Sequence, residues 1–156
     1  MNEEFRNAAI YGDFEVVKKI IKKDKTVVTA LDKYRFTVLH DVVAEHSLEM
    51  VELLISSGAD VNAQNDEGIA PLHLAGYDYI VLALLKHGAI LELETNNGET
   101  PLSIHAQGID SEEVMEALLE AGASPLHKNN QGKTPIDIAN ARNEYEKIKL
   151  LQSYVK

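Results

Sequence analysis

The stretch Ile69-Ala70-Pro71-Leu72-His73-Leu74-Ala75 decides the fold, because related segments return along the chain at a nearly constant spacing. Its segment 70–73 corresponds to Thr37-Val38-Leu39-His40, Thr100-Pro101-Leu102-Ser103 and Thr134-Pro135-Ile136-Asp137. Successive copies begin 33, 30 and 34 residues apart. Self-similarity at a period of this length is typical of a repeat protein.

Two further markers move in register with the first. Gly58-Ala59 returns as Gly88-Ala89 and Gly122-Ala123, and Gly68 returns as Gly98 and Gly132. Each Gly-Ala pair stands at the same distance before the next copy of the first segment. Three coincident markers are hard to obtain by chance, so we interpret the whole chain as a set of repeats.

Each marker has a physical role in a unit of two helices and a loop. Thr-Pro predicts a helix start, because the hydroxyl caps the first turn and the N–H that Pro lacks is not needed there. Residues 48–55 then predict a second helix with an apolar stripe of Leu48, Val51, Leu54 and Ile55. Gly58 ends that helix, and the polar residues 60–68 form a loop. We expect Leu54 and Leu85 to be buried between units.

A helix pair of this size cannot bury its apolar face alone, so successive pairs must stack into a solenoid. The period and the Ala70-Pro71-Leu72-His73 segment resemble the ankyrin-repeat family over essentially the whole chain. The resemblance implies an all-α ankyrin-repeat solenoid of stacked antiparallel helix pairs with hairpin-like loops, about ten helices in a single domain, residues 1–156. We expect about five repeats, at residues 1–32, 33–64, 65–94, 95–128 and 129–156.

The outer two repeats are predicted to act as caps with a polar outward face. The predicted polar residues are Lys18, Lys19, Lys22 and Lys23 in the first unit and Glu144, Glu146, Lys147 and Lys149 in the last. The third repeat is shortened after Ala75, and the fourth has an insertion near residues 107–110. We expect the stack to be irregular at these two places.

Composition excludes several classes of protein. The chain has 156 residues and no Cys, which excludes disulfides, zinc–thiolate sites and a cysteine nucleophile. Glu3 and Glu4 stand where a secretory signal would carry positive charge, and no apolar stretch reaches membrane-spanning length. We therefore expect a soluble, cytoplasmic protein that does not enter a membrane.

The net charge of −10 is unevenly distributed. Residues 36–127 carry sixteen acids and a single base, Lys86, whereas residues 1–35 and 128–156 are mildly basic. This pattern favours a partner with a basic surface and disfavours nucleic acid, which needs a basic stripe. The cluster of lysines from Lys18 to Lys25 is interpreted as the soluble face of a cap, with contact to phosphate as the less favoured alternative.

No motif in the sequence indicates catalysis, a metal or a cofactor. The resemblance implies that His40 and His73 bond neighbouring backbone and Thr groups. His46, His87, His105 and His127 are scattered, without the spacing of metal ligands. Glu112, Glu113, Glu116 and Glu120 indicate a solvated helix face. We find no nucleophile elbow or phosphate-binding loop, so we predict that the chain is not an enzyme.

The resemblance implies that partners bind a concave face made by loop tips and first helices. The positions that match the family's variable contact positions are Tyr34, Phe36, Glu45, Asp66, Glu67, Ile69, Asn96, Asn97, Glu99, Gln107, Gln131, Lys133 and Arg142. Apolar or aromatic residues at exposed tips are typical interface anchors. The alternative for Tyr34 and Phe36 is that they cover the junction with the first cap.

These observations predict a module for protein–protein interaction that is a monomer on its own and binds a basic partner through an acidic concave face. Two biological roles stay open, because neither leaves a motif. One is a general adaptor or scaffold, and the other is an immunity or antitoxin protein that neutralises a toxic enzyme. A nucleic-acid-associated adaptor is a less favoured third alternative.

Overall fold

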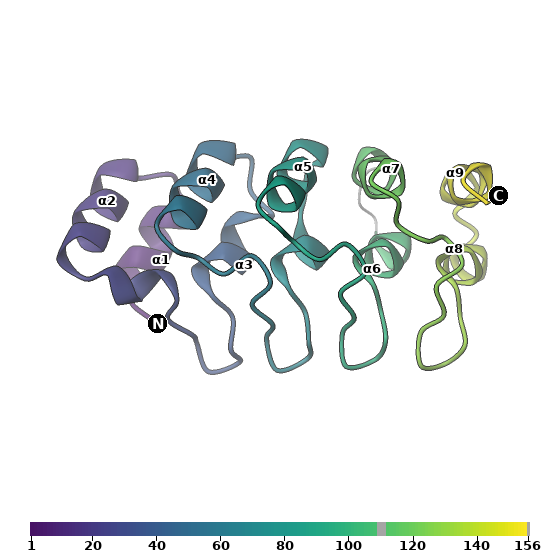
Figure 1. Ribbon diagram of the computed structural model, residues 1–156, viewed down its shortest axis with the longest axis horizontal. Coiled ribbons are helices and arrows are strands. Elements are labelled where there is room, and N and C mark those ends of the chain that lie inside the picture. Colours follow the sequence, from purple (N-terminus) through teal and green to yellow (C-terminus); the bar gives the residue numbers. More distant parts are fainter. Residues whose placement is uncertain (109–111, 156) are drawn as a thin grey trace.

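The computed structural model describes residues 1–108 and 112–155 (Figure 1). Within these residues the chain forms α-helices and 3₁₀ turns joined by loops, with no strand. The elements are α1 (Glu3–Ile10), α2 (Phe14–Lys23), η1 (Lys25–Val28), α3 (Val38–Val42), α4 (Leu48–Ser56), η2 (Pro71–Leu74), α5 (Asp78–Lys86), α6 (Pro101–Gln107), α7 (Glu112–Glu120), α8 (Pro135–Arg142) and α9 (Tyr145–Ser153).

The helices pair and stack in chain order, and the two termini lie at opposite ends of the row (Figure 1). The second helices α2, α4, α5, α7 and α9 form one row, and the first elements of the pairs form a second row beside it. Four long loops project from the side of the first elements. This arrangement confirms the predicted all-helical solenoid. The first element of the third pair is the single turn η2 in place of an α-helix.

The Thr residues start their helices as predicted. The Oγ1 atom of Thr100 accepts a hydrogen bond from the Ser103 N–H (3.3 Å), and that of Thr134 accepts one from the Asp137 N–H (3.1 Å). Asp137 returns the interaction by accepting from the Thr134 N–H (2.9 Å). This backbone hydrogen bond lowers the pKa of Asp137, because it stabilises the carboxylate. Both donors at the helix start are thereby satisfied.

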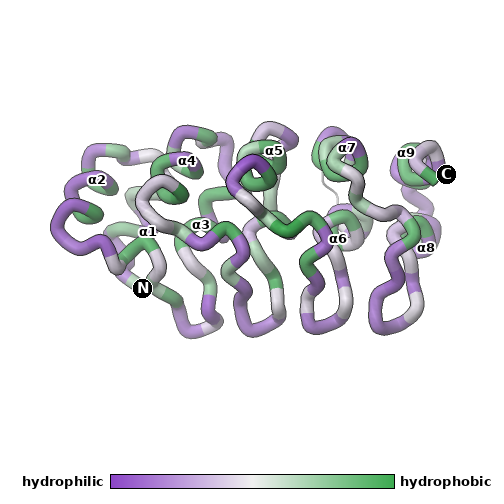
Figure 2. Tube along the Cα trace, viewed as in Figure 1, coloured by the Kyte–Doolittle hydropathy of each residue, from purple (hydrophilic) through white to green (hydrophobic). Residues whose placement is uncertain are grey.

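The core lies between neighbouring pairs, and the second helices, which carry hydrophobic residues (Figure 2), supply much of it. Leu54 and Leu84 are fully buried at 0% exposure. The prediction for Leu85 was wrong, because this side chain is only partly buried. Leu84, not Leu85, stands four residues before Gly88, as Leu54 stands four residues before Gly58.

The long loops are folded by one recurring acceptor side chain. Asn65 Oδ1 accepts hydrogen bonds from the N–H groups of Glu67 (2.9 Å) and Ile69 (2.8 Å). The residues at the same position in the other loops make the corresponding pair of bonds; they are Asp32, Thr95 and Asn129. Side chains that bond backbone two residues on are typical of tight turns.

The tips of successive loops are tied together by single backbone hydrogen bonds, which we name the tip ladder. The carbonyls of Tyr34, Glu67 and Asn97 accept from the next loop at 3.1, 2.9 and 3.0 Å. Their donors are the N–H groups of Asp66, Asn96 and Asn130. The ladder fixes each tip against the next, so the groups on the tips keep a defined spacing.

The shortening predicted after Ala75 is visible in the third pair. Gly76 lies two residues after the end of η2, and its N–H donates to the Val43 carbonyl at 3.0 Å. A Cβ on Gly76 would lie 2.9 Å from the carbonyl oxygen of Ala44, so the close approach requires glycine. The insertion predicted near residues 107–110 lies partly outside the described residues.

The polar faces of the two caps only partly match the prediction. Lys18, Lys19, Lys22 and Lys23 are exposed, as are Glu146 and Lys149. The prediction that Lys147 is solvated was wrong, because the residue is only 5% exposed. Its Nζ atom donates to the carbonyl of His105 (3.1 Å) and to that of Gly108 (2.5 Å), at the end of α6. The ammonium group thus satisfies carbonyls that the helix end leaves without partners.

Candidate protein-binding groove

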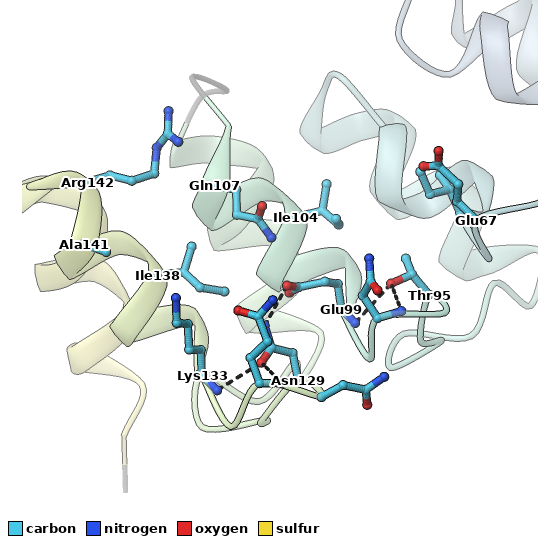
Figure 3. A pocket seen from close by; sticks show the side chains of 14 residues that line it. Glu67, Thr95, Glu99, Ile104, Gln107, Asn129, Lys133, Ile138, Ala141 and Arg142 are labelled. Carbon is cyan, nitrogen blue, oxygen red and sulfur yellow. Dashed lines mark hydrogen bonds between the residues drawn. The ribbon is translucent and has the colours of Figure 1, made fainter.

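A groove of about 420 Å³ runs along the last three pairs, between the loop tips and the helices α6 and α8 (Figure 3). Three isoleucines line it: Ile69 follows a loop glycine, Ile104 lies on α6 and Ile138 on α8. Polar side chains surround them, and we call the whole lining the groove. Its residues are Glu67, Ile69, Thr95, Asn97, Glu99, Ile104, Gln107, Asn129, Asn130, Gln131, Lys133, Ile138, Ala141 and Arg142.

The groove brings together most of the contact residues that the sequence predicts for the third to fifth repeats. They are Glu67, Ile69, Asn97, Glu99, Gln107, Gln131, Lys133 and Arg142. Residues far apart in the sequence meet here because each repeat contributes the same positions to one face of the stack. That these residues contact a partner stays a prediction.

The remaining predicted contact residues lie outside the groove. Tyr34 is 55% exposed, and Lys33 Nζ lies 4.6 Å from the centre of its ring. Phe36 is partly buried and packs edge-on against His40, with ring centres 5.3 Å apart, so it covers a structural side chain. Glu45 is exposed after α3.

Two predicted contact residues are engaged at the loop tips. Asp66 lies with its carboxylate 3.8 Å from Arg35 Nε, in an exposed ion pair. Asn96 donates through its side chain to the Asp66 carbonyl at 2.8 Å. Asn96 therefore supports the tip ladder with both its backbone and its side chain.

Sequence reasoning missed several lining residues. Ile104 and Ile138 each stand four residues after the capping Thr. That fixed offset was the signal that could have found them. Thr95 and Asn129 were missed because this loop position is not occupied by the same residue in every repeat. Asp32, Asn65, Thr95 and Asn129 belong to three residue types that accept the same backbone hydrogen bonds.

Charges of both signs line the groove. Glu67 lies at one end, whereas Lys133 and Arg142 lie at the other, with Ile138 and Ala141 between these two cations (Figure 3). Glu99 is half-buried between the two ends, and its Oε1 accepts a hydrogen bond from Asn129 Nδ2 at 2.7 Å. Its other carboxylate oxygen, Oε2, is buried without a hydrogen-bond partner among the described residues. A buried acceptor in this state favours a donor from outside.

An internal ion pair bounds the groove toward the first repeat. Asp41 stands four residues after Thr37, at the position that Ile104 and Ile138 occupy in later repeats. Its carboxylate accepts from Arg6 Nη2 at 2.6 Å, and Asp32 lies 3.9 Å from Arg6 Nη1. The hydrogen bond to Asp41 raises the pKa of Arg6. Charge that is neutralised internally replaces the apolar lining here.

His40 and His73 join successive repeats. The Nδ1 atom of His40 accepts from the Thr37 N–H (3.1 Å), and its Nε2–H donates to the Ile69 carbonyl (3.1 Å). His73 accepts from the Ala70 N–H (3.1 Å) and donates to the Glu99 carbonyl (3.3 Å). Burial lowers the pKa of both histidines, since it disfavours the charged form.

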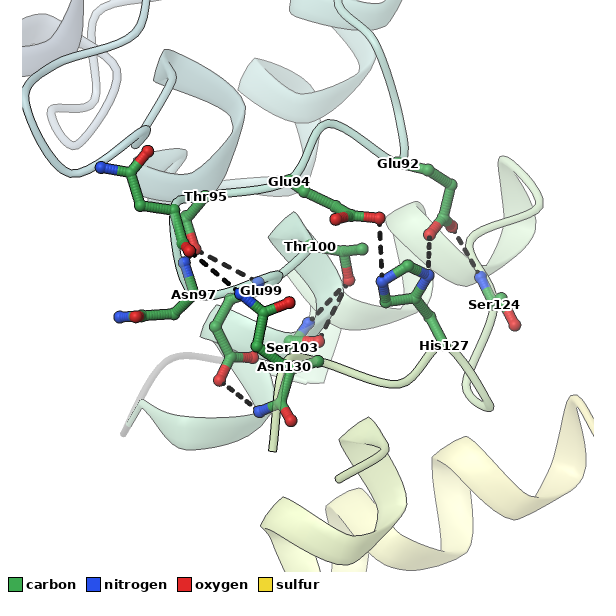
Figure 4. A network of polar contacts seen from close by, with 12 residues as sticks. Glu92, Glu94, Thr95, Asn97, Glu99, Thr100, Ser103, Ser124, His127 and Asn130 are labelled. Atoms are coloured by element: carbon green, nitrogen blue, oxygen red, sulfur yellow. Dashed lines mark hydrogen bonds and ion pairs between the residues drawn. The ribbon is translucent and has the colours of Figure 1, made fainter. Parts of the chain in front are cut away.

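Three other histidines also contact neighbouring repeats. His87 Nε2 lies 2.7 Å from Glu52, and His127 lies between Glu92 and Glu94 at 3.9 and 3.3 Å (Figure 4). His46 bonds the Tyr77 hydroxyl at 2.6 Å. Across the part of the chain that the structure describes, no three His, Asp or Glu side chains form a group that could hold a metal ion.

Within residues 1–108 and 112–155, every helix falls short of the length and apolarity that a membrane crossing requires.

The sequence is similar to several characterised proteins. It is 35% identical over 134 residues to the human transient receptor potential cation channel subfamily A member 1, covering 83% of this chain and 12% of the channel. It is 33% identical over 135 residues to the chicken nuclear factor NF-kappa-B p105 subunit, covering 82% and 14%. It is 32% identical over 93 residues to human protein phosphatase 1 regulatory subunit 27, covering 58% and 60%. The chain thus spans less than two thirds of each of these relatives.

A family model for ankyrin repeats (3 copies) matches residues 5–95 and 72–156. Together these two matches span residues 5–156 and so reach every helix pair described above. The recurring Thr-Pro starts, the loop glycines and the stacked helix pairs agree with that match. The chain belongs to the ankyrin-repeat family.

Proposed function

We propose that the chain is a non-catalytic module that binds a partner protein in the groove of its last three repeats. The observation that carries this proposal is a set of groove side chains that have no hydrogen-bond partner within the described residues. Asn97, Gln107 and Gln131 make no side-chain hydrogen bond with any other described residue, although they surround the apolar isoleucines. An apolar centre with a polar rim is typical of a protein–protein interface.

The relatives support this proposal. Two of them are named as subunits, one of a phosphatase and one of nuclear factor NF-kappa-B. Ankyrin repeats are the part of each relative that this chain resembles. We infer that the same kind of surface serves protein recognition in this chain.

We propose further that the partner presents basic side chains to the acidic loop tips. Asp66 and Glu67 are exposed at neighbouring positions of one tip, and Glu99 follows in the next repeat. The exposed glutamates of α7 extend the negative charge along the second helices. Lys133 and Arg142 lie at the opposite end of the groove, so the acidic character is strongest over the third and fourth repeats.

Site-specific photo-crosslinking tests the binding surface. A photoreactive residue replaces Gln107 or Gln131 in the groove, and a control replaces Glu116 on the exposed side of α7. In an extract of the native host, we expect protein adducts at the two groove positions and none at the control. Adducts at Glu116 alone would place binding on the second helices and overturn the proposal.

A further inference from the structure

The opposite charges of the groove are carried by side chains without a direct partner among the described residues, although the charge of Lys133 also acts on Asp137. The side chains of Glu67, Lys133 and Arg142 make no hydrogen bond or ion pair with any other described residue. Asp41 and Arg6, at the corresponding face of the earlier repeats, neutralise each other. The charges at the two ends of the groove are therefore available to an occupant, and they select its charge pattern.

The lining between these ends suits an extended main chain. Ile69, Ile104 and Ile138 follow one another along the stack, one from each repeat, and offer contact to an apolar side chain. The free amides of Asn97 and Gln107 each supply both donors and acceptors, as a peptide backbone requires. The unpartnered Oε2 of Glu99 requires a donor, which a main-chain N–H provides.

The length of the occupant follows from the repeat geometry. Neighbouring packed helices lie roughly 8–10 Å apart, so the two steps from the third to the fifth repeat span about 20 Å. An extended chain advances about 3.3 Å per residue. A segment of about six residues therefore crosses from the third to the fifth repeat.

We propose that the groove binds an extended peptide segment with a basic and an acidic residue about six positions apart and an apolar residue between them. The basic residue lies against Glu67, the acidic residue against Arg142, and the apolar side chain contacts the isoleucines. This inference rests on the proposed function, since the segment is the part of the partner protein that enters the groove.

The test uses the full chain and a phage-displayed library of random twelve-residue peptides. We expect selected peptides to carry the paired charges around an apolar residue. Binding of a synthetic selected peptide is then measured by fluorescence anisotropy. Arg142→Glu should weaken it about tenfold, and replacing the acidic residue of the peptide by Lys should restore affinity for that variant.

A matched control is Lys149→Glu, an exposed lysine on α9 outside the groove, which should leave the affinity within about twofold of the original. Selected peptides without paired charges would overturn the inference. It would also be overturned if Arg142→Glu and the Lys replacement in the peptide each lowered the affinity and their losses added when the two were combined. If crosslinks at Gln107 and Gln131 persist in that case, only the peptide pattern is wrong. If they are also absent, the proposed function has failed.

Discussion

His40 and His73 make a residue-scale prediction about pH. Both rings accept a backbone N–H at Nδ1, so protonation would remove an acceptor that the helix start needs. Burial lowers their pKa in the folded state below the ordinary value of about 6.5 that the unfolded chain keeps. The unfolded state therefore binds more protons at acidic pH, and stability is lost as the pH falls below about 6.5.

We expect each of these two histidines to contribute up to about 1.4 kcal/mol of this loss per pH unit. His73→Gln should be less stable than the original protein at pH 7.5 but lose less stability between pH 7.5 and pH 5.5. His40→Gln should behave in the same way. Urea unfolding at the two pH values measures both effects, and an unchanged pH dependence in both variants would contradict the assignment.

The leucines of the second helices give a prediction about burial. Leu54 and Leu84 are fully buried between repeats, whereas Leu85 is only partly buried. Leu54→Ala and Leu84→Ala should each destabilise the protein by about 2–5 kcal/mol, because each leaves a cavity. Leu85→Ala should have a clearly smaller effect. Equal shifts of the thermal midpoint for Leu84→Ala and Leu85→Ala would contradict the difference in burial between these two leucines.

At the scale of the elements, two loop glycines separate backbone strain from contact between repeats. Gly98 and Gly132 share a φ of +73°. A Cβ on Gly98 would lie 2.7 Å from Asn130 Oδ1 and 2.9 Å from Asn130 N, whereas one on Gly132 meets no atom within 4 Å among the described residues. The two positions differ only in whether a following loop is packed against them.

We expect Gly132→Ala to reduce stability by about 1–2 kcal/mol, from the left-handed backbone alone. Gly98→Ala should add roughly 1–3 kcal/mol to that, because Asn130 must move. The difference between their urea-unfolding free energies measures how tightly the tip ladder packs. Identical unfolding free energies for the two variants would mean that the loop containing Asn130 moves away from residue 98 at no energetic cost.

Lys147 makes a second prediction at this scale, because it connects α9 to the end of α6. Lys147→Met keeps the aliphatic packing but leaves the carbonyls of His105 and Gly108 without this donor, which should reduce stability by about 1–3 kcal/mol. Lys149→Met, at an exposed position of the same helix, should change it by less than about 0.5 kcal/mol. Equal stabilities would argue against a capping role.

At the scale of the whole molecule, much of the architecture could be predicted from the sequence. The three markers and the apolar stripe around Leu54 depend only on local spacing, and local spacing determines how a repeat stacks on an identical neighbour. The resemblance to the family had named eight of the residues that line the groove, and their contact with a partner stays a prediction. Lys147 was misplaced because its partners are carbonyls of another repeat, which no side-chain pattern records. The contact positions predicted from the sequence already included Lys133 and Arg142, but the net charge of residues 36–127 favoured an acidic face, because net charge does not report which face a side chain occupies.

The charge distribution makes a prediction about association. Asp66→Lys with Glu67→Lys should slow binding of the crosslinked partner protein, and raising the ionic strength should slow the original protein as well, because salt screens the attraction. We leave Glu99 unchanged, since it bonds Asn129 inside the groove. Lys22→Glu with Lys23→Glu, on the exposed face of α2, is the control. Binding kinetics at two ionic strengths measure the association rates. An association rate that changes neither with salt nor with the tip substitutions would contradict attraction by the acidic tips.

The tip ladder gives the stack a polarity that has a practical consequence. Each tip accepts a hydrogen bond from the one that follows, and in the last loop the Gln131 carbonyl holds the accepting position without a donor among the described residues. Beside it, Gly132 keeps open the space that Asn130 fills next to Gly98. The loop of an additional repeat engineered after the fifth could therefore donate to the Gln131 carbonyl and pack beside Gly132 without any change in the last loop. Once the polar face of α9 is made apolar, the groove could be lengthened one repeat at a time to recognise longer segments.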